Sequence, residues 1–373
     1  MEYKGLMLGQ QGDVGVDTEH WKFGTIKDGV KLIDNLLYYS AFSIGYDDHG
    51  IIDKVCTRMK GFKHEMGDSL FLGHAGPTVN SPHVDLANRL WNMTNGYRPV
   101  FALSGSDGVE VAIKLAFAYH QRCGNTRKKI ASFDDAYHGA TLLSISVGDV
   151  HFKSAYYGMD PYQNVIKLSR NNLQQEVDWE DVACIIIETC PHDQDISPYG
   201  FDVWNKVNEI QSKHDVLVII DDIFMGGGKT GSFFGWDKLP IKPDLFVMGK
   251  AITGGFFPLS MAMFNDKVYE KIKDGNWLHG HTYSMTLSGV ICMDEYLNVL
   301  ENYKYMDNVQ NIIEIAKQSL SRDGWNISGN FGTTFMINKS DKHFRFIVPI
   351  NADQEYFDAI PDTLTEMTKV HKL

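Results

Sequence analysis

A lysine follows an apolar stretch that is typical of a buried strand. The stretch KPDLFVMGKAITGG covers residues 242–255, with Leu245–Met248 as its apolar core and Lys250 two positions further on. Lysine is among the costliest side chains to bury, so Lys250 either extends its amine to solvent or uses it for chemistry. A primary amine in an apolar pocket is a nucleophile that forms a Schiff base with an aldehyde, which is the chemistry this position predicts.

A second stretch, FALSGSDGVEVAIKLA, has the pattern of a phosphate site. It places Ser104, Gly105 and Ser106 between an apolar run and a predicted helix that starts near Asp107. Backbone N–H groups at a helix start bind anions, the Ser106 hydroxyl adds a donor, and a glycine permits close approach. A serine that only caps the helix is the simpler interpretation of the same residues.

Two further stretches place polar or aromatic groups after predicted strands. In DDAYHGAT, Tyr137 and His138 follow a strand, and an aromatic ring there could stack on a flat ligand. In VLVIIDDIFMGGGKTG, strand alternation points Asp221 and Asp222 to opposite sides, so one carboxylate can face a ligand. A carboxylate in that place would keep a ring nitrogen protonated. Taken singly, Tyr137 is more often a core or surface tyrosine, and Asp221 more often caps a turn.

The elements expected to position these groups form an α/β fold. Short apolar runs alternate with helical patterns, such as the amphipathic spacing from Val109 to Phe117. This alternation predicts a mostly parallel sheet covered on both faces, with ligands at the carboxyl ends of its strands. The strand candidates are residues 31–37, 129–133, 184–187, 216–220, 245–248 and 259–264.

The pattern changes near residue 286 to long helices, 287–300 and 306–321, and then to short strands, 333–337 and 344–350. The sequence therefore predicts a large ligand-binding domain over residues 51–285. A smaller α+β domain is expected from residues 286–373 together with an N-terminal segment, 1–50.

Composition excludes several classes of partner and site. The chain has 373 residues and a net charge of −12, which argues against a nucleic acid or an anionic membrane as partner. Its five cysteines are scattered and form no CxxC pair, so neither a disulfide framework nor a metal site is expected. No apolar stretch approaches a membrane span of about 20 residues, and MEYKGLMLGQQGD lacks the core of a signal peptide. We therefore expect a cytoplasmic protein.

Taken together, these stretches resemble the class III aminotransferases, which are pyridoxal-phosphate enzymes of the aspartate aminotransferase fold, fold type I. The resemblance extends from about Lys31 to Pro349, and the motifs occur in the order of the family. The stretches that carry it are SGSDGVEVAIKLA, YHG, DDIFMGGGKTG, GKAITGGFFPL and HGHTYS. The resemblance implies pyridoxal 5'-phosphate as cofactor and a homodimer with active sites at the subunit interface.

The resemblance also implies the roles of the residues that act on the cofactor. Lys250 would form the Schiff base and later move the proton, and Asp221 would pair with the ring nitrogen. Ile223 and Tyr137 would cover the two ring faces. The remaining cofactor-binding residues would be Ser104, Gly105 and Ser106 at the phosphate, Thr282 reaching the neighbouring subunit's phosphate, Glu188 near the ring hydroxyl, and His138 beside Tyr137.

Substrate residues follow from the same resemblance and from its departures. Arg345, in FRFIVP, stands where the family places the arginine that binds the substrate carboxylate through its bidentate fork. Asp193 stands where ornithine-type members carry a glutamate that pairs with this arginine, which suggests an Asp193–Arg345 gate. Phe224 replaces a common glutamine, Lys229 replaces a common arginine, and the chain is short between Thr282 and Arg345.

These features favour a ping-pong transaminase with an ornithine- or diaminobutyrate-like ω-amino donor, because the Asp-Asp pair resembles diaminobutyrate aminotransferases. KAITGGFFPLSMA favours an alternative, an adenosylmethionine-8-amino-7-oxononanoate aminotransferase of biotin synthesis. A glutamate-1-semialdehyde aminomutase ranks lower because its GGGKTG region looks different. A rival of another class is a protein that binds pyridoxal phosphate without turnover.

Overall fold

A computed structural model describes residues 19–61, 81–148, 162–191, 196, 198–275, 279–281, 283–322 and 324–370. Two of the predicted site residues, Asp193 and Thr282, lie outside the described residues. Within these ranges, every helix is too short or too polar to cross a membrane.

The large sheet has seven strands in the order β4-β10-β9-β8-β7-β5-β6. β10 runs antiparallel to both of its neighbours, and the pairs from β9 to β6 are all parallel. The expectation of a mostly parallel sheet is thus confirmed. The strands are β4 Arg98–Ala102, β5 Lys129–Phe133, β6 Val165–Leu168, β7 Val182–Glu188, β8 Leu217–Asp221, β9 Leu245–Met248 and β10 Ser260–Phe264.

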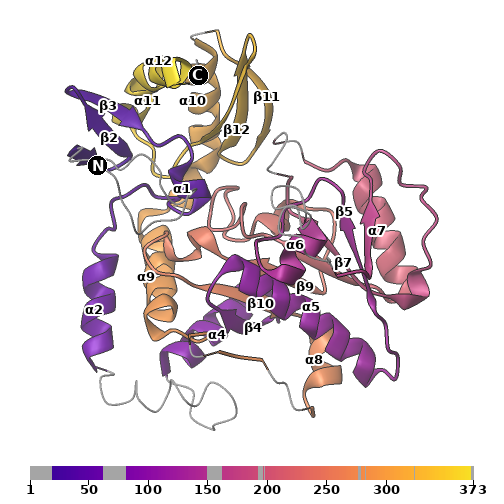
Figure 1. Ribbon diagram of the computed structural model, residues 1–373. Coiled ribbons are helices and arrows are strands. Elements are labelled where there is room, and N and C mark those ends of the chain that lie inside the picture. The colour runs from indigo at the N-terminus through magenta and orange to yellow at the C-terminus, as the bar shows by residue number, and fades with distance from the viewer. Residues whose placement is uncertain are drawn as a thin grey trace, which may run out of the picture.

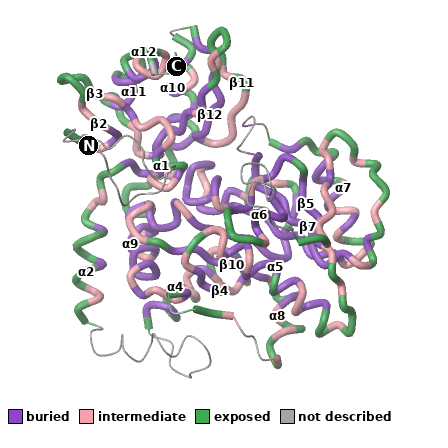
Figure 2. Tube along the Cα trace, viewed as in Figure 1, coloured by how far each residue is buried: buried purple, intermediate pink, exposed green. Residues whose placement is uncertain are grey.

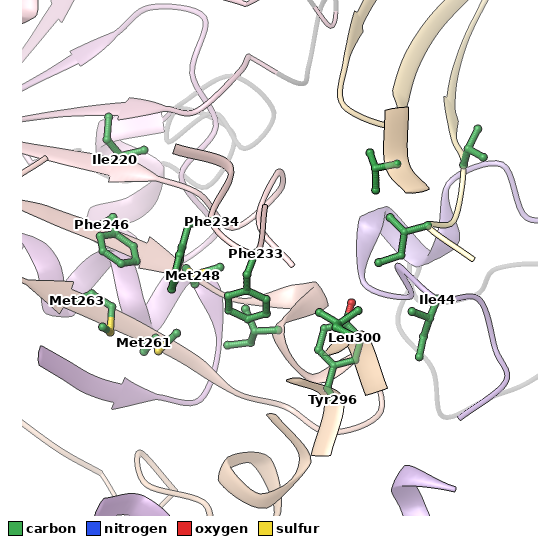
Figure 3. Packing of buried hydrophobic residues seen from close by; sticks show 14 of the residues in the cluster. Ile44, Ile220, Phe233, Phe234, Phe246, Met248, Met261, Met263, Tyr296 and Leu300 are labelled. Carbon is green, nitrogen blue, oxygen red and sulfur yellow. The ribbon is translucent and has the colours of Figure 1, made fainter. Parts of the chain in front are cut away.

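Both faces of this sheet are buried, which explains why its central strands are continuous apolar runs. Along β8, Leu217 and Ile219 pack in one cluster with α5, whereas Val218 and Ile220 pack in a second cluster with α7. Figure 3 shows Ile220 and other members of the second cluster, and Figure 2 shows the buried centre. The covering helices are α4 Ser81–Thr94, α5 Gly105–Arg122, α6 Leu142–Gly148, α7 Phe201–His214, α8 Asp266–Ile272 and α9 Leu287–Tyr303.

The N-terminal and C-terminal segments lie side by side, away from the large sheet (Figure 1). A buried hydrogen bond from the Ile33 N–H to Thr363 Oγ1, 2.9 Å long, joins them. The elements are β1 Glu19–Trp21, β2 Gly24–Lys27, β3 Val30–Ile33, α10 Val309–Arg322, β11 Asn326–Phe331, β12 Thr334–Lys339, β13 Lys342–Ile347, α11 Gln354–Asp358 and α12 Ile360–Val370. The division into domains at residues 50 and 285 stays a prediction.

Two expected elements differ from the structure. The strand expected over 31–37 ends at Ile33, because the Asp34 carboxylate accepts hydrogen bonds from the N–H groups of residues 36–38 and starts a turn, α1 Leu37–Ser40. The helix expected over 306–321 begins at Val309, after a 3-10 turn Tyr305–Asn308. Strands β1, β2, β6 and β11 were not among the expected elements. Helix α2, Ile51–Gly61, contacts α9.

Candidate active site

Three ionisable side chains meet at the carboxyl edge of the large sheet. Glu188 ends β7 and Asp221 ends β8, and the two residues are paired in register. Lys250 follows the end of β9, the next strand. The three strands are parallel, so their last residues necessarily lie at one edge, where open α/β sheets bind ligands. Glu188 and Asp221 are both buried.

Asp221 and Asp222 have separate sets of partners, as expected for neighbours that point to opposite sides. Oδ2 of Asp221 is hydrogen-bonded to Nδ1 of His138 at 2.8 Å, and Oδ1 accepts from the Ile223 N–H. A carboxylate has about four lone-pair sites, so Asp221 can still accept from a ligand. Oδ1 of Asp222 instead accepts from the Thr189 hydroxyl at 2.6 Å, and burial raises the pKa of Asp222 to about 7.

Glu188 holds the loop that carries the aromatic residue of the YHG motif. Its Oε1 accepts a hydrogen bond from the Tyr137 N–H at 2.9 Å. Burial raises the pKa of Glu188 to about 8, and the neighbouring Asp221 adds to the rise, whereas His138 and Lys250 oppose it. Burial therefore favours the neutral form of Glu188, and the Tyr137 N–H favours its carboxylate.

The predicted phosphate loop lies at the start of α5. Ser104 is the N-cap of this 18-residue helix, and its side chain accepts from the Asp107 N–H at 3.3 Å. The capping interpretation of Ser104 is thus what the structure shows. The Ser106 hydroxyl accepts from the Ala140 N–H at 3.0 Å, which joins the helix start to the loop after His138.

Glycine is required where the motifs approach each other. A Cβ on Gly105 would lie 2.9 Å from Cδ1 of Ile223, and one on Gly139 would lie 2.3 Å from Oγ of Ser106. Gly139 also has a φ of +118°, which other residues rarely adopt. The start of α5, the loop that carries Tyr137 and the turn that follows Asp221 are therefore packed into direct contact.

Lys250 lies in a strained backbone position beside an aromatic ring. Its φ is 49°, and it opens the 3-10 turn Lys250–Thr253 directly after Gly249. Its Nζ lies 4.8 Å from the centroid of the Phe224 ring. Burial lowers the pKa of Lys250 to about 8, although Asp221 and Glu188 oppose the shift. About a tenth of the amine is thus neutral, and nucleophilic, at pH 7, far more than in an exposed lysine.

Arg345 reaches this site from the C-terminal segment. It lies on β13, and its Cζ is 5.4 Å from the centroid of the Phe224 ring. Its backbone carbonyl accepts a hydrogen bond from Nδ2 of Asn35 at 2.7 Å. Phe224 is therefore a site residue that the sequence analysis noted only as a departure. Its position three residues after Asp221 was the available signal.

The donor set fits a phosphorylated aldehyde with a nitrogen-containing ring. Lys250 supplies an amine, Asp221 a carboxylate for a ring nitrogen, and the start of α5 an anion site beside Gly105 and Ser106. The second ring nitrogen of His138, Nε2, is buried and has no hydrogen-bond partner among the described residues. The roles predicted for these residues stay predictions.

The fold is that of the pyridoxal-phosphate-dependent transaminases, fold type I. A transaminase from the marine bacterium Virgibacillus superposes with a TM-score of 0.81 at 17% sequence identity, and the match covers 98% of this chain and 95% of that chain. The seven-stranded sheet with one antiparallel strand is thus part of a known architecture.

The chain belongs to the class III aminotransferases: the family model described as "Aminotransferase class-III" matches residues 18–326. Pyridoxal phosphate is the cofactor of this family. An uncharacterized aminotransferase of Sinorhizobium fredii is 28% identical over 76% of this chain and 66% of its own length. An acetylornithine aminotransferase of Shewanella oneidensis is 31% identical over 66% of this chain and 60% of its own length. The chain thus matches less than two thirds of the length of these two relatives.

Proposed function

We propose that this chain is a pyridoxal-phosphate-dependent transaminase that moves an amino group between an amino acid or diamine and an oxo acid or aldehyde. The observation that carries the proposal is the meeting of an amine of lowered pKa, Lys250, with the carboxylates of Asp221 and Glu188 at the carboxyl edge of the sheet. Perturbed ionisable groups gathered in this way are typical of active sites.

Each of the site residues has a separate role in the proposed reaction. When bound, the cofactor supplies an electron sink for the carbanion that forms at the substrate carbon. Asp221, held by His138, keeps the ring nitrogen protonated. Nζ of Lys250 takes up the substrate proton and returns it, because the amine at this position is partly neutral. Arg345 binds a substrate carboxylate.

An ornithine- or diaminobutyrate-like ω-amino donor is the substrate class we favour. The acetylornithine aminotransferase among the relatives supports it, as does the Asp221–Asp222 pair. The proposal includes a homodimer in which Thr282 of each subunit reaches the cofactor phosphate of the other. Sedimentation of the purified protein tests this part, and a mass of a single chain would contradict it.

A spectral half-reaction screen tests the function. The purified protein is loaded with pyridoxal phosphate and mixed separately with glutamate, alanine, ornithine, diaminobutyrate, putrescine and adenosylmethionine. We expect at least one donor, ornithine or diaminobutyrate first, to convert the bound cofactor to its amine form. Lys250→Ala should lose both the absorption band of the attached cofactor and the conversion, slowing turnover by at least about a thousandfold.

Two outcomes would contradict the proposal. If the wild-type protein holds its cofactor but no donor converts it, the chain is a binding protein without turnover. If Lys250→Ala turns over a donor at the wild-type rate, the amine has been assigned wrongly.

A further inference from the structure

Phe224 lies beside both cations of the candidate active site. Nζ of Lys250 lies over its ring at 4.8 Å from the centroid, and Cζ of Arg345 lies over it at 5.4 Å. The ring is 5% exposed and packs in an apolar cluster with Leu37 and Met225. Because both groups lie over the same ring, the amine and the guanidinium are no further apart than these two distances added together.

The ring attracts each of the two groups. Like charges repel, and the nearby Arg345 contributes to the lowered pKa of Lys250. The face of an aromatic ring carries partial negative charge and attracts both cations, most strongly where water is excluded. An aliphatic side chain of similar size would fill the same space without this attraction.

The backbone of Phe224 is fixed from the N-terminal segment. Its carbonyl accepts a hydrogen bond from the fully buried Ser40 hydroxyl at 3.0 Å. Ser40 ends α1, the turn Leu37–Ser40, whose φ values run from 45° to 73°. Left-handed backbone of this kind in residues other than glycine persists only where surrounding contacts fix it, and it gathers at functional sites.

The same segment also fixes the backbone of Arg345. The Asn35 side chain donates to the Arg345 carbonyl, and the Asn35 carbonyl accepts from the Ile347 N–H at 2.8 Å. Residues 35–40 thus hold β13 at one end and Phe224 at the other. This short segment therefore contacts the backbone of both residues whose side chains meet at the ring.

We propose that Phe224 is a positioning residue that sets the substrate class of the site: its ring holds the Arg345 guanidinium at a fixed place relative to Lys250. The site then selects amino donors that carry a carboxylate over simple amines. This inference rests on the proposed function, because it concerns the substrate of the same site.

Binding of glutarate to the cofactor-loaded protein, measured by calorimetry, tests the proposal without turnover. Glutarate carries carboxylates but no amine and no carbonyl group. Phe224→Leu keeps apolar volume and removes the ring, and we expect it to weaken glutarate binding about tenfold. Phe224→Tyr keeps the ring and should bind within about twofold of wild type. Met225→Leu, a change in the same cluster, is the matched control and should bind like wild type.

Kinetics give a second readout. Phe224→Leu should raise the KM for a carboxylate-bearing donor about tenfold relative to the KM for an alkylamine, whereas Phe224→Tyr should leave this ratio near the wild-type value. Thermal unfolding checks that each variant is folded, and Phe224→Met replaces Phe224→Leu if the latter is not.

Several results would overturn the proposal: no glutarate binding by the wild type, equal binding by wild type and Phe224→Leu, or equal losses in Phe224→Leu and Met225→Leu. Ring-dependent glutarate binding in a protein that converts no donor would uphold this inference and contradict the proposed function instead.

Discussion

Two lysines with lowered pKa values differ in what their amines can reach. Lys229 is fully buried, donates to the Gly226 carbonyl at 2.7 Å, and has a pKa lowered to about 7 by burial. Lys250 instead lies at the end of β9 beside Phe224, with a pKa lowered to about 8. A low pKa alone therefore does not mark the reactive lysine. The reactive lysine is distinguished by its position at the carboxyl edge of the sheet.

The lowered pKa predicts how cofactor capture depends on pH. The amine reacts only when neutral, so its reactivity appears as pH rises through the folded-state pKa. We expect the rate at which the apoprotein captures pyridoxal phosphate to rise about tenfold between about pH 7 and about pH 9 and then to level off. Stopped-flow absorbance measures this rate.

An ordinary lysine would give a different profile, because its rate would keep rising in proportion to hydroxide above about pH 9. Such a profile would contradict the burial argument. Lys229→Met is the control, and it should keep the capture of cofactor that Lys250→Ala loses.

At the scale of elements, the turn α1 is a costly piece of backbone. Leu37 and Ser40 are buried, whereas Tyr39 has a φ of 55° and is 62% exposed. The buried residues explain why the turn is kept, because Ser40 binds the Phe224 carbonyl. At Tyr39 the left-handed backbone has a steric cost, and the exposed side chain makes no buried contacts that would offset it.

Tyr39→Gly should therefore stabilise the protein. Removing the clash at Cβ gains roughly 1–2 kcal/mol, and the extra freedom of glycine in the unfolded chain returns about 0.5–1 kcal/mol of that gain. Urea unfolding should show a higher midpoint. Gln318→Gly, at an exposed position inside α10, is the control and should lower the free energy of unfolding by about 1 kcal/mol. Equal losses in the two variants would show that the turn stores no strain.

At the scale of the whole molecule, the N-terminal strands are joined to the C-terminal helices by apolar packing, such as Phe23 on Tyr356, and by two kinds of polar contact. One kind is exposed ion pairs, such as Lys27 with Glu366. The other is the buried hydrogen bond from the Ile33 N–H to Thr363 Oγ1, whose hydroxyl also donates to the Ala359 carbonyl. Exposed pairs gain little because water screens them, so the buried bond should matter more.

Replacing Thr363 tests this ranking. Thr363→Val keeps the shape but leaves the Ile33 N–H buried without an acceptor, which should cost about 1–3 kcal/mol of stability in urea unfolding. Lys27→Ala should leave the midpoint nearly unchanged. A larger loss in Lys27→Ala than in Thr363→Val would reverse the ranking.

The sequence alone determined the central strands of the large sheet and the groups at its edge. Strands β5, β7, β8 and β9 are short apolar runs, and the positions of Glu188, Asp221 and Lys250 at or just after strand ends follow from local pattern. Parallel strands bring their ends together whatever the details of packing. Motif order was enough to indicate the family that the family model then showed.

Only the tertiary structure decided how Phe224 meets Arg345 and Lys250. Arg345 is separated from Phe224 by more than a hundred positions, and their approach depends on how β13 docks against residues 35–40. The left-handed turn was also invisible, because Leu37–Ser40 contains no glycine to indicate positive φ. The local sequence pattern indicates which side chains are buried. The distance between two elements depends on all the contacts between them, which no local pattern contains.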